Sequence, residues 1–312
     1  MLILNITSTD PAGSVMNLVK AVNRYTKHKA RLITTHRILK FDFDYDIWQV
    51  KDDLNEVEYL LNNADVFHLH KIDEDYILYD RFLVKDFTKG KPIFYHHHGN
   101  KIFRDNPEHF RWKYKMKNAK VFVSTPDLLR LIPEAKYLPN CVPINDVRYL
   151  PRGRVKKEKV VVGHCPTNRE LKNTELFIDT IVKLKEKYDI EGVVIEDKTL
   201  KETLELKRLC HIGFDHLGGY YGLSALEFLS MGIPTVSGLD ELNKTQIREF
   251  FGCSEIPFVI ANKDNLYKTI ETLIKDAGMR EEIGIKSRKF MERYWTEKYI
   301  ANKYIEEVKK EC

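Results

Sequence analysis

The chain has 312 residues, of which 43% are hydrophobic and 31% are charged. This composition excludes a disordered chain and is typical of a soluble globular protein, and the length allows two domains that each bury a core. The formal net charge of +5, from 51 basic and 46 acidic residues, permits an anionic ligand or an acidic membrane surface but does not require nucleic acid.

Short apolar strands and helices alternate along the first half of the chain. Strands are predicted at 2–6, 31–35, 65–70, 92–97 and 120–124. Helices are predicted at 13–27, 53–62 and 73–87, with another beginning near Pro107. The first strand, M-L-I-L-N-I-T, lacks the basic region and long apolar run of a signal peptide.

The same alternation fills the second half. Strands are predicted at 160–163, 192–195, 211–215, 235–237 and 258–260. Helices are predicted at 174–188, 203–209, 223–231, 244–251, 263–275, 279–294 and 296–310. Such alternation predicts an α/β protein with two Rossmann-like parallel sheets, each covered on both faces, and ligands bind such sheets at the carboxyl ends of the strands. Residues 152–159 are expected to form an exposed basic linker between the two halves.

The cysteines and the lack of a long apolar run indicate the compartment. Five cysteines, at 141, 165, 210, 253 and 312, are scattered without metal-site spacing. We expect free thiols in a reducing compartment. No apolar run approaches the length of a membrane span. A soluble cytoplasmic protein is therefore expected.

A glycine-rich loop leads into an apolar helix at 223–231, whose only charge is Glu227. Glycines at 218, 219 and 222 precede the helix. Free backbone N–H groups and the positive end of the helix dipole suit a phosphate there. A diphosphate at Gly222 and Leu223, with sugar hydroxyls reaching Glu227, would satisfy both features. The alternative is a buried glycine turn in which Glu227 pairs with a Lys or Arg.

Arg169 and Lys172 lie where the strand at 160–163 leads into the next helix. Side chains three residues apart in a first helical turn share one face, so both can reach one diphosphate. Positive charge is unfavourable at a helix N-terminus. This mismatch favours a binding function over the alternative of a solvated basic helix start.

Together these motifs resemble the nucleotide-sugar-binding domain of GT-B glycosyltransferases, specifically the family-4-like group. G-H-C-P-T-N-R-E-L-K-N-T at 163–174 resembles the loop whose Arg and Lys clamp the donor diphosphate. Y-G-L at 221–223, Glu227 and M-G-I-P at 231–234 resemble the helix whose Glu binds the nucleotide ribose. L-P-N at 138–140 resembles the lead-in to the interdomain linker, and the helix around Trp295 resembles the segment that crosses back to the first domain.

The resemblance implies two Rossmann-like domains facing a cleft. The expected parts are an acceptor-side domain at 1–140, a linker at 141–158, a nucleotide-sugar-binding domain at 159–290 and a C-terminal helix at 291–312 that packs on the first domain. It implies a metal-independent, retaining hexosyltransferase that uses a UDP- or GDP-linked sugar and no other cofactor. The acceptor would be a glycan, a lipid-linked molecule or another hydroxyl compound in polysaccharide or glycoconjugate synthesis.

One position departs from the family pattern. Many relatives have an acidic residue eight positions before the ribose-binding Glu, where this chain has Gly219. A sub-group with G-x-Y-G at this place also resembles the chain. Asp215, at the end of its strand, is a candidate catalytic substitute that orients the sugar, or it caps the following loop; both interpretations stay open.

In the first half, the resemblance singles out a glycine loop and one histidine. The loop at 8–14 resembles the family's glycine loop, and Gly13 would approach the diphosphate or the acceptor. The simpler interpretation is that Ser8 or Thr9 caps the turn and Pro11 begins the helix. His98, which precedes Gly99, matches a histidine that faces the donor sugar. Arg104 is near enough in sequence to line the acceptor side of the cleft.

Two pairs of histidines end neighbouring strands, at 68 and 70 and at 96 and 98. Alternation places each pair on one face, so four imidazoles could face one metal ion. Because no nearby Asp or Cys completes a recognised spacing, we assign no metal site from the sequence. The other interpretation of His68, His70 and His96 is that they simply fill strand ends near solvent.

Residues 103–117 interleave aromatic and basic side chains. Such a surface could contact anionic lipid at the inner face of the membrane, or it is a solvated helix with aromatic side chains against the core. The alternatives to a glycosyltransferase are a nucleotide-sugar epimerase of the same fold and a non-catalytic nucleotide-sugar-binding scaffold.

Overall fold

The computed structural model describes residues 1–10, 12–36, 38, 42–48, 54–153 and 159–312. The chain forms two compact units. One contains Met1–Cys141 together with Glu297–Cys312, and the other contains Val142–Thr296. Residues 154–158 of the expected basic linker lie outside the described residues. So do Pro11, which the simpler interpretation of the glycine loop places at the start of a helix, and residue 53, the first residue of the helix predicted at 53–62.

A seven-stranded sheet forms the centre of the first unit, and every ladder in it is parallel. Its strands lie in the order β3 (Ile47–Trp48), β2 (Lys29–Thr34), β1 (Leu2–Thr7), β4 (Val66–His70), β7 (Ile93–His97), β8 (Lys120–Val123) and β9 (Lys136–Tyr137). The predicted strands are present, but β3 and β9, of two residues each, are too short to show a pattern in the sequence.

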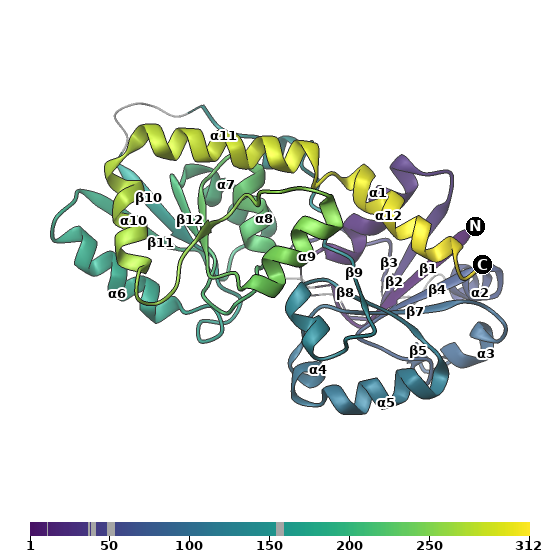
Figure 1. Cartoon of the computed structure of the whole chain (residues 1–312). Helices are drawn as coiled ribbons and strands as arrows, with labels where there is room; N and C mark the ends of the chain where they lie inside the picture. The colour runs from purple at the N-terminus through teal and green to yellow at the C-terminus, as the bar shows by residue number, and fades with distance from the viewer. Residues whose placement is uncertain (11, 37, 39–41, 49–53, 154–158) are drawn as a thin grey trace. The chain divides into compact units, whose positions relative to one another are not determined.

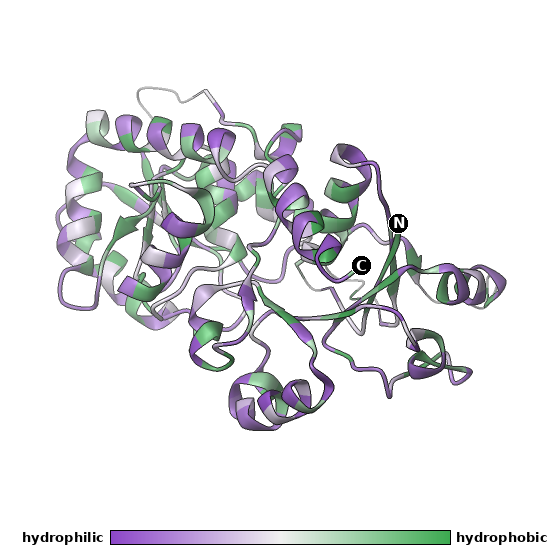
Figure 2. Ribbon diagram, turned by 45° about the vertical axis from the view of Figure 1, so that its right-hand side comes forward, coloured by the Kyte–Doolittle hydropathy of each residue, from purple (hydrophilic) through white to green (hydrophobic). Residues whose placement is uncertain are grey.

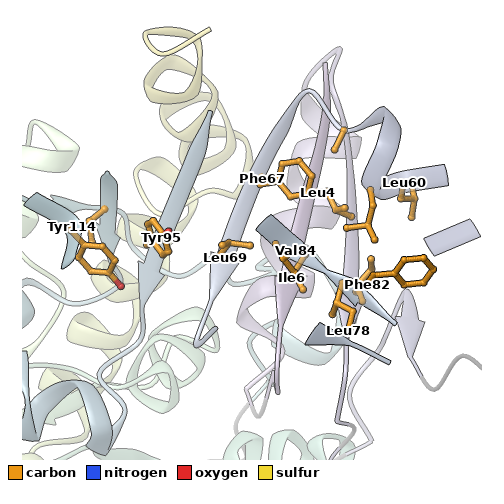
Figure 3. Close-up of a cluster of buried hydrophobic side chains, with 14 of the residues drawn as sticks. Leu4, Ile6, Leu60, Phe67, Leu69, Leu78, Phe82, Val84, Tyr95 and Tyr114 are labelled. Atoms are coloured by element: carbon orange, nitrogen blue, oxygen red, sulfur yellow. The ribbon is translucent and has the colours of Figure 1, made fainter. Parts of the chain in front are cut away.

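The two faces of this sheet carry different side chains. Leu4, Ile6, Phe67, Leu69 and Tyr95 pack in one buried apolar cluster (Figure 3). Successive side chains of a strand point to opposite faces, so the residues between them lie on the other face. On that face α12 lies beside α1 (Figure 1), and Tyr304 of α12 stacks on His68. The C-terminal helix therefore packs on the first unit, as predicted.

The helices of the first unit are mostly those predicted. They are α1 (Ser14–Tyr25), α2 (Leu54–Asn63), α3 (Val84–Thr88), α4 (Lys101–Asp105), α5 (Pro107–Lys117) and α12 (Glu297–Lys309), with a 3-10 turn at Pro126–Arg130. The prediction of one helix at 73–87 is wrong. In its place are a two-stranded antiparallel hairpin of β5 (Ile77–Leu78) and β6 (Phe82–Leu83), followed by the short α3. The φ angles of Tyr79 and Asp80 are 54° and 56°, which reverse the chain and end any helix.

The second unit has a five-stranded sheet, also parallel throughout. Its order is β11 (Ile190–Val194), β10 (Val160–His164), β12 (Ile212–Phe214), β13 (Thr235–Ser237) and β14 (Val259–Ile260). Its helices are α6 (Thr174–Lys185), α7 (Leu200–Leu209), α8 (Leu223–Ser230), α9 (Glu241–Phe251), α10 (Leu266–Lys275) and α11 (Ala277–Arg293), with a 3-10 turn at Val147–Tyr149. In both units the strands are largely hydrophobic, whereas the helices carry mixed surfaces (Figure 2). The predicted class of two parallel-sheet α/β regions is confirmed.

Arg288 of helix α11 forms hydrogen bonds with several other segments of the second unit. This side chain is buried, and its Nη1 donates to the carbonyl oxygens of Ser230 at 2.7 Å and Ile144 at 3.1 Å. A third carbonyl, that of Tyr149, lies 3.4 Å away. One guanidinium thus joins α11 to the end of α8 and to the segment that enters the unit.

Among the described residues, no helix combines the length and the apolar character needed to cross a lipid bilayer.

Candidate functional site

The second unit brings predicted residues together where its strand order changes direction. From β10, the chain next forms β11 on one side and then β12 on the other. Crevices at such switch points, outside the carboxyl ends of the strands, are where ligands bind in open α/β sheets. Helices α6 and α8 follow β10 and β12 respectively, so both begin at this end of the sheet.

Asp215 follows β12 directly and closes the loop that leads to α8. The backbone N–H of Gly222 donates to Asp215 Oδ2 at 2.7 Å, and Lys172 Nζ lies 3.4 Å from Oδ1. His216 Nε2 lies 3.4 Å from Oδ2. Burial alone would raise the pKa of Asp215, but His216, Lys172 and the Gly222 N–H lower it below its usual value. Asp215 is therefore ionised, and it caps the loop; its proposed contact with the sugar stays a prediction.

Lys172 and Asn173 connect this loop to the start of α6. The Lys172 side chain is 13% exposed, and its ammonium also lies 5.5 Å from the centre of the Tyr220 ring. Asn173, with φ of 54°, is the N-cap residue of α6, and its Oδ1 accepts the N–H of Leu217 at 2.8 Å. The sequence analysis missed Asn173 and Tyr220, although Asn in a turn before a helix is a recognisable signal.

The start of α8 has donors that no side chain caps. Gly222 is its N-cap residue, and within the described part of the chain no side-chain cap bond occurs there. Lys172 and Asp215 pack closely against the backbone of Gly222, because a Cβ there would lie 2.6 Å from Lys172 Nζ and 3.0 Å from Asp215 Oδ1. The loop, Lys172 and Asp215 therefore form one compact group at the N-terminus of α8.

Arg169 does not join this group. Its side chain is half exposed and pairs with Glu175 at 3.0 Å and with Glu196 at 2.7 Å. Water screens exposed ion pairs such as these, so an anion of higher charge would compete well for this guanidinium. The predicted role of Arg169 requires that the side chain leave these two carboxylates.

Glu227 has a buried partner. Its carboxylate forms an ion pair with Lys207 Nζ from α7, and the two side chains are 9% and 1% exposed. Burial alone would lower the pKa of Lys207, but Cys165 and the negative charge of Glu227 raise it above its usual value. This pairing is the alternative that the sequence left open. One carboxylate has acceptors for two partners, and the ribose contact of Glu227 stays a prediction.

Gly219 adopts a conformation that favours glycine. Its φ is 87°, and a Cβ there would lie 3.1 Å from Asp240 Oδ2. A carboxylate at position 219 would therefore be strained and would face another carboxylate. The local backbone conformation therefore accounts for a glycine, and not an acidic residue, at position 219.

In the glycine loop of the first unit, a side chain of the loop itself accepts backbone N–H groups from the start of α1. Gly13 is the N-cap residue of α1 with φ of 63°, and Asp10 accepts the N–H groups of Val15 at 3.1 Å and Met16 at 3.0 Å. Asp10, which the sequence analysis missed, accepts these N–H groups of the first turn of α1, and the interpretation that Ser8 or Thr9 caps the preceding turn stays a prediction. The Asp10 carboxylate satisfies donors that a diphosphate at Gly13 would otherwise use.

His98 and Arg104 lie near one another in the first unit. His98 Nε2 is 3.0 Å from His70 Nδ1, and burial lowers the pKa of His98 to about 3. Arg104 donates from Nε to the Gly99 carbonyl at 3.0 Å and pairs with Asp127 at 2.7 Å. Arg104 thus holds the turn that directly follows His98.

Comparison with known proteins identifies the fold. No family model matches the chain, and no curated protein sequence matches it significantly. Several solved structures match over nearly the whole chain. The Anabaena protein HepE in complex with UDP-glucose has 14% identity and a TM-score of 0.66, over 99% of this chain and 100% of that one.

Two further structures agree. A sucrose-phosphate synthase from Thermosynechococcus elongatus has 13% identity and a TM-score of 0.63, covering 99% of both chains. A glycosyltransferase from Rickettsia africae has 12% identity and a TM-score of 0.61, covering 99% of this chain and 98% of that one. At such identities the likeness is one of fold, and the predicted fold is confirmed.

Proposed function

We propose that this chain, which has the GT-B fold, is a glycosyltransferase that takes a sugar from a nucleotide-diphosphate sugar. The observation that carries the proposal is the group formed by Lys172, Asp215 and Gly222 at the uncapped start of α8. Proteins with this fold have been solved with UDP and with UDP-glucose. A buried ammonium beside free backbone donors is suited to a diphosphate.

The donor diphosphate would bind Lys172 and the backbone at Gly222 and Leu223, once the Gly222 N–H is released by Asp215, with Arg169 turning from its surface carboxylates to reach it. These groups would stabilise the negative charge of the departing nucleoside diphosphate. We propose that this charge makes an added metal ion unnecessary for transfer, and that UDP or GDP is the nucleotide. Glu227 would accept hydrogen bonds from the ribose hydroxyls while Lys207 balances its charge.

For the donor sugar and the acceptor, the proposed contacts follow from the hydrogen-bonding groups and charges of single side chains. Asp215 would orient the donor sugar, and His98, a neutral imidazole, would hydrogen-bond a sugar hydroxyl. Gly13 would approach the diphosphate if Asp10 released the N–H groups of Val15 and Met16, and we assign Arg104 to the acceptor side. Retention of the anomeric configuration is part of the proposal. The acceptor is a hydroxyl compound such as a glycan or a lipid-linked molecule.

Helix α5 is the proposed contact with an acidic membrane. Trp112 and Met116 lie one turn apart and are 65% and 70% exposed, and Ile102 of α4 is 70% exposed. Lys113 and Lys117 form ion pairs with Asp73 and Glu74 of this chain, which reduces the charge available for lipid. Insertion of the exposed Trp112 and Met116 side chains would supply most of the binding free energy.

The first test measures nucleotide binding by calorimetry with UDP, GDP, ADP and their common sugar conjugates, in a chelating buffer without added metal. We expect one nucleotide family to bind, and Lys172→Ala to weaken its binding by about 10–100-fold, the loss expected for one charge-assisted hydrogen bond. Glu227→Ala and Arg169→Ala should also weaken binding. Lys183→Ala, an exposed lysine of α6, is the control and should leave affinity unchanged.

The outcomes separate the alternatives. Hydrolysis of the bound donor, or transfer to an added acceptor, supports the enzyme. Epimerised donor would point to an epimerase, and binding without any turnover to a scaffold. If no nucleotide binds to the folded wild-type chain, the donor site is absent and the proposal fails.

A second test uses Gly222→Ala. The φ of Gly222 is −100°, so alanine fits the backbone, and the atoms nearest to the new methyl group belong to Lys172 and Asp215. We expect the Lys172 ammonium to be displaced, nucleotide affinity to fall about 10-fold, and the free energy of unfolding to change by about 1 kcal/mol. Gly153→Ala, where a Cβ has no neighbour within 4 Å and the φ angle is not positive, is the matched control for nucleotide binding. Equal affinities for the two variants would remove Gly222 from the site.

A further inference from the structure

Three histidines of the first unit share the sheet face that lies under α12. His68 and His70 lie two residues apart on β4, so their side chains point to the same face. His96 of β7 is paired in register with His70. The intervening side chains, Leu69 and Tyr95, belong to the apolar cluster on the opposite face (Figure 3). Parallel pairing therefore brings the three imidazoles together, and all three are buried.

The hydrogen bonds of His70 determine which of its nitrogens is free to coordinate. Asn5 Nδ2 donates to the Arg31 carbonyl at 3.3 Å, so Asn5 Oδ1 is the atom that faces His70 Nε2 at 3.2 Å. His70 Nε2 must then carry the proton, and Nδ1 carries the lone pair. In the metal-free arrangement this lone pair accepts the N–H of His98 Nε2 at 3.0 Å.

His68 and His96 have no such partners. Both ring nitrogens of each lack a hydrogen-bond partner among the described residues. The two rings are stacked, with their centres 5.3 Å apart and their planes within 8°. A buried polar atom left without a partner costs about 1–3 kcal/mol. Native proteins leave few such atoms, and each of these two neutral rings has one lone pair that a metal ion can use.

The chemistry of the rings selects the class of ligand. Burial lowers the pKa of His68 to about 3 and the pKa values of His70 and His96 well below the usual value. Neutral imidazoles offer lone pairs and repel no cation. Nitrogen donors without carboxylates suit Zn²⁺, Co²⁺, Ni²⁺ or Cu²⁺ and do not suit Mg²⁺ or Ca²⁺.

We propose that His68, His70 and His96 bind one Zn²⁺-class transition-metal ion. Their ligand atoms all lie within 4.8 Å of one another, and tetrahedral coordination at about 2.0–2.1 Å requires them about 3.4 Å apart. To bind one ion, His68 and His96 must turn from their stacked arrangement so that their lone pairs converge. Asn5 orients His70 from the second shell, as ligating histidines require. The ion displaces the His98 N–H from His70 Nδ1, so its binding frees His98.

This site is separate from the group formed by Lys172, Asp215 and Gly222, because all its residues belong to the first unit and that group belongs to the second. The ion has a structural and positioning role, and no step of sugar transfer passes through it. Failure of nucleotide binding would leave the metal site untouched, and failure of metal binding would leave the donor site untouched.

The test uses the full chain, treated with a chelator and then dialysed against Co²⁺ or Zn²⁺. We expect one ion per chain by elemental analysis, a visible Co²⁺ spectrum of tetrahedral nitrogen coordination, and a melting temperature that rises with Zn²⁺ concentration. His96→Gln should weaken binding by at least about 100-fold, beyond the usual cost of losing a second-shell partner. His109→Gln, an exposed histidine on α5, is the matched control.

A wild-type chain that takes up no ion overturns the proposal. So does His96→Gln binding as tightly as the control, since the ion would then be elsewhere. His68→Gln serves as a second variant if His96→Gln does not fold. Should neither fold, the wild-type Co²⁺ spectrum decides, because a spectrum of six oxygen ligands would contradict imidazole coordination.

Discussion

Lys207→Met is expected to lower the free energy of unfolding of the second unit by about 3–5 kcal/mol, the usual cost of removing one partner of a buried ion pair. The pair with Glu227 is almost fully shielded from water. Methionine keeps most of the volume of the lysine side chain, so the loss comes from the carboxylate that stays buried without its partner. Urea unfolding followed by circular dichroism measures the change.

The double variant Lys207→Met/Glu227→Gln is the control. It replaces both charges by neutral groups of similar size, and such replacements are often neutral or stabilising. We expect it to recover most of the lost stability while nucleotide binding stays weak. A double variant as unstable as Lys207→Met would mean that packing, rather than charge, holds α7 and α8 together.

A second large effect is expected from Arg288→Met. The substitution removes the donor shared by the carbonyls of Ser230 and Ile144 and leaves them buried without partners. Each unsatisfied group costs about 1–3 kcal/mol, so for the two carbonyls we expect a loss of about 2–6 kcal/mol in the free energy of unfolding. Thermal or urea unfolding measures it, and the cooperativity of the second unit should be retained.

Lys289→Met, one residue further along α11 and exposed, provides the comparison. It changes the same charge on the same helix without removing a buried hydrogen bond, and its effect should be within about 0.5 kcal/mol. Equal losses in the two variants would show that the carbonyls find other donors, and that Arg288 does not fasten the segment containing Ile144.

The alternation of strands and helices was predictable because it depends on local apolar patterns. Strand 235–237 and the start of α8 at Leu223 were placed to the residue. The hairpin inside 73–87 was missed because Tyr79 and Asp80 adopt left-handed conformations without the glycine or asparagine that usually indicates such a turn. Tertiary packing of Leu78 and Phe82 decides that turn, and pattern alone cannot show it.

The site was predictable to the extent that strand ends meet at one edge of a sheet. That rule places Lys172, Asp215 and Gly222 near one another without any structure. It cannot show that Arg169 turns to Glu196, or that Lys207 pairs with Glu227, because both partners come from elements elsewhere in the sequence. The histidine pairs were visible, but the missing hydrogen-bond partners of His68 and His96 depend on every neighbour of the face.

The place of α12 in the chain has a consequence for biosynthesis. Val142–Thr296 is synthesised whole before Glu297, so the second unit has all its strands while the first still lacks the helix that lies against His68. Ribosomes add about 5–20 residues per second, so that face stays uncovered for on the order of 10 s in each round of translation. The N-terminal unit is the one that finishes last, and its histidine-bearing face is the surface that chaperones would meet on the nascent chain.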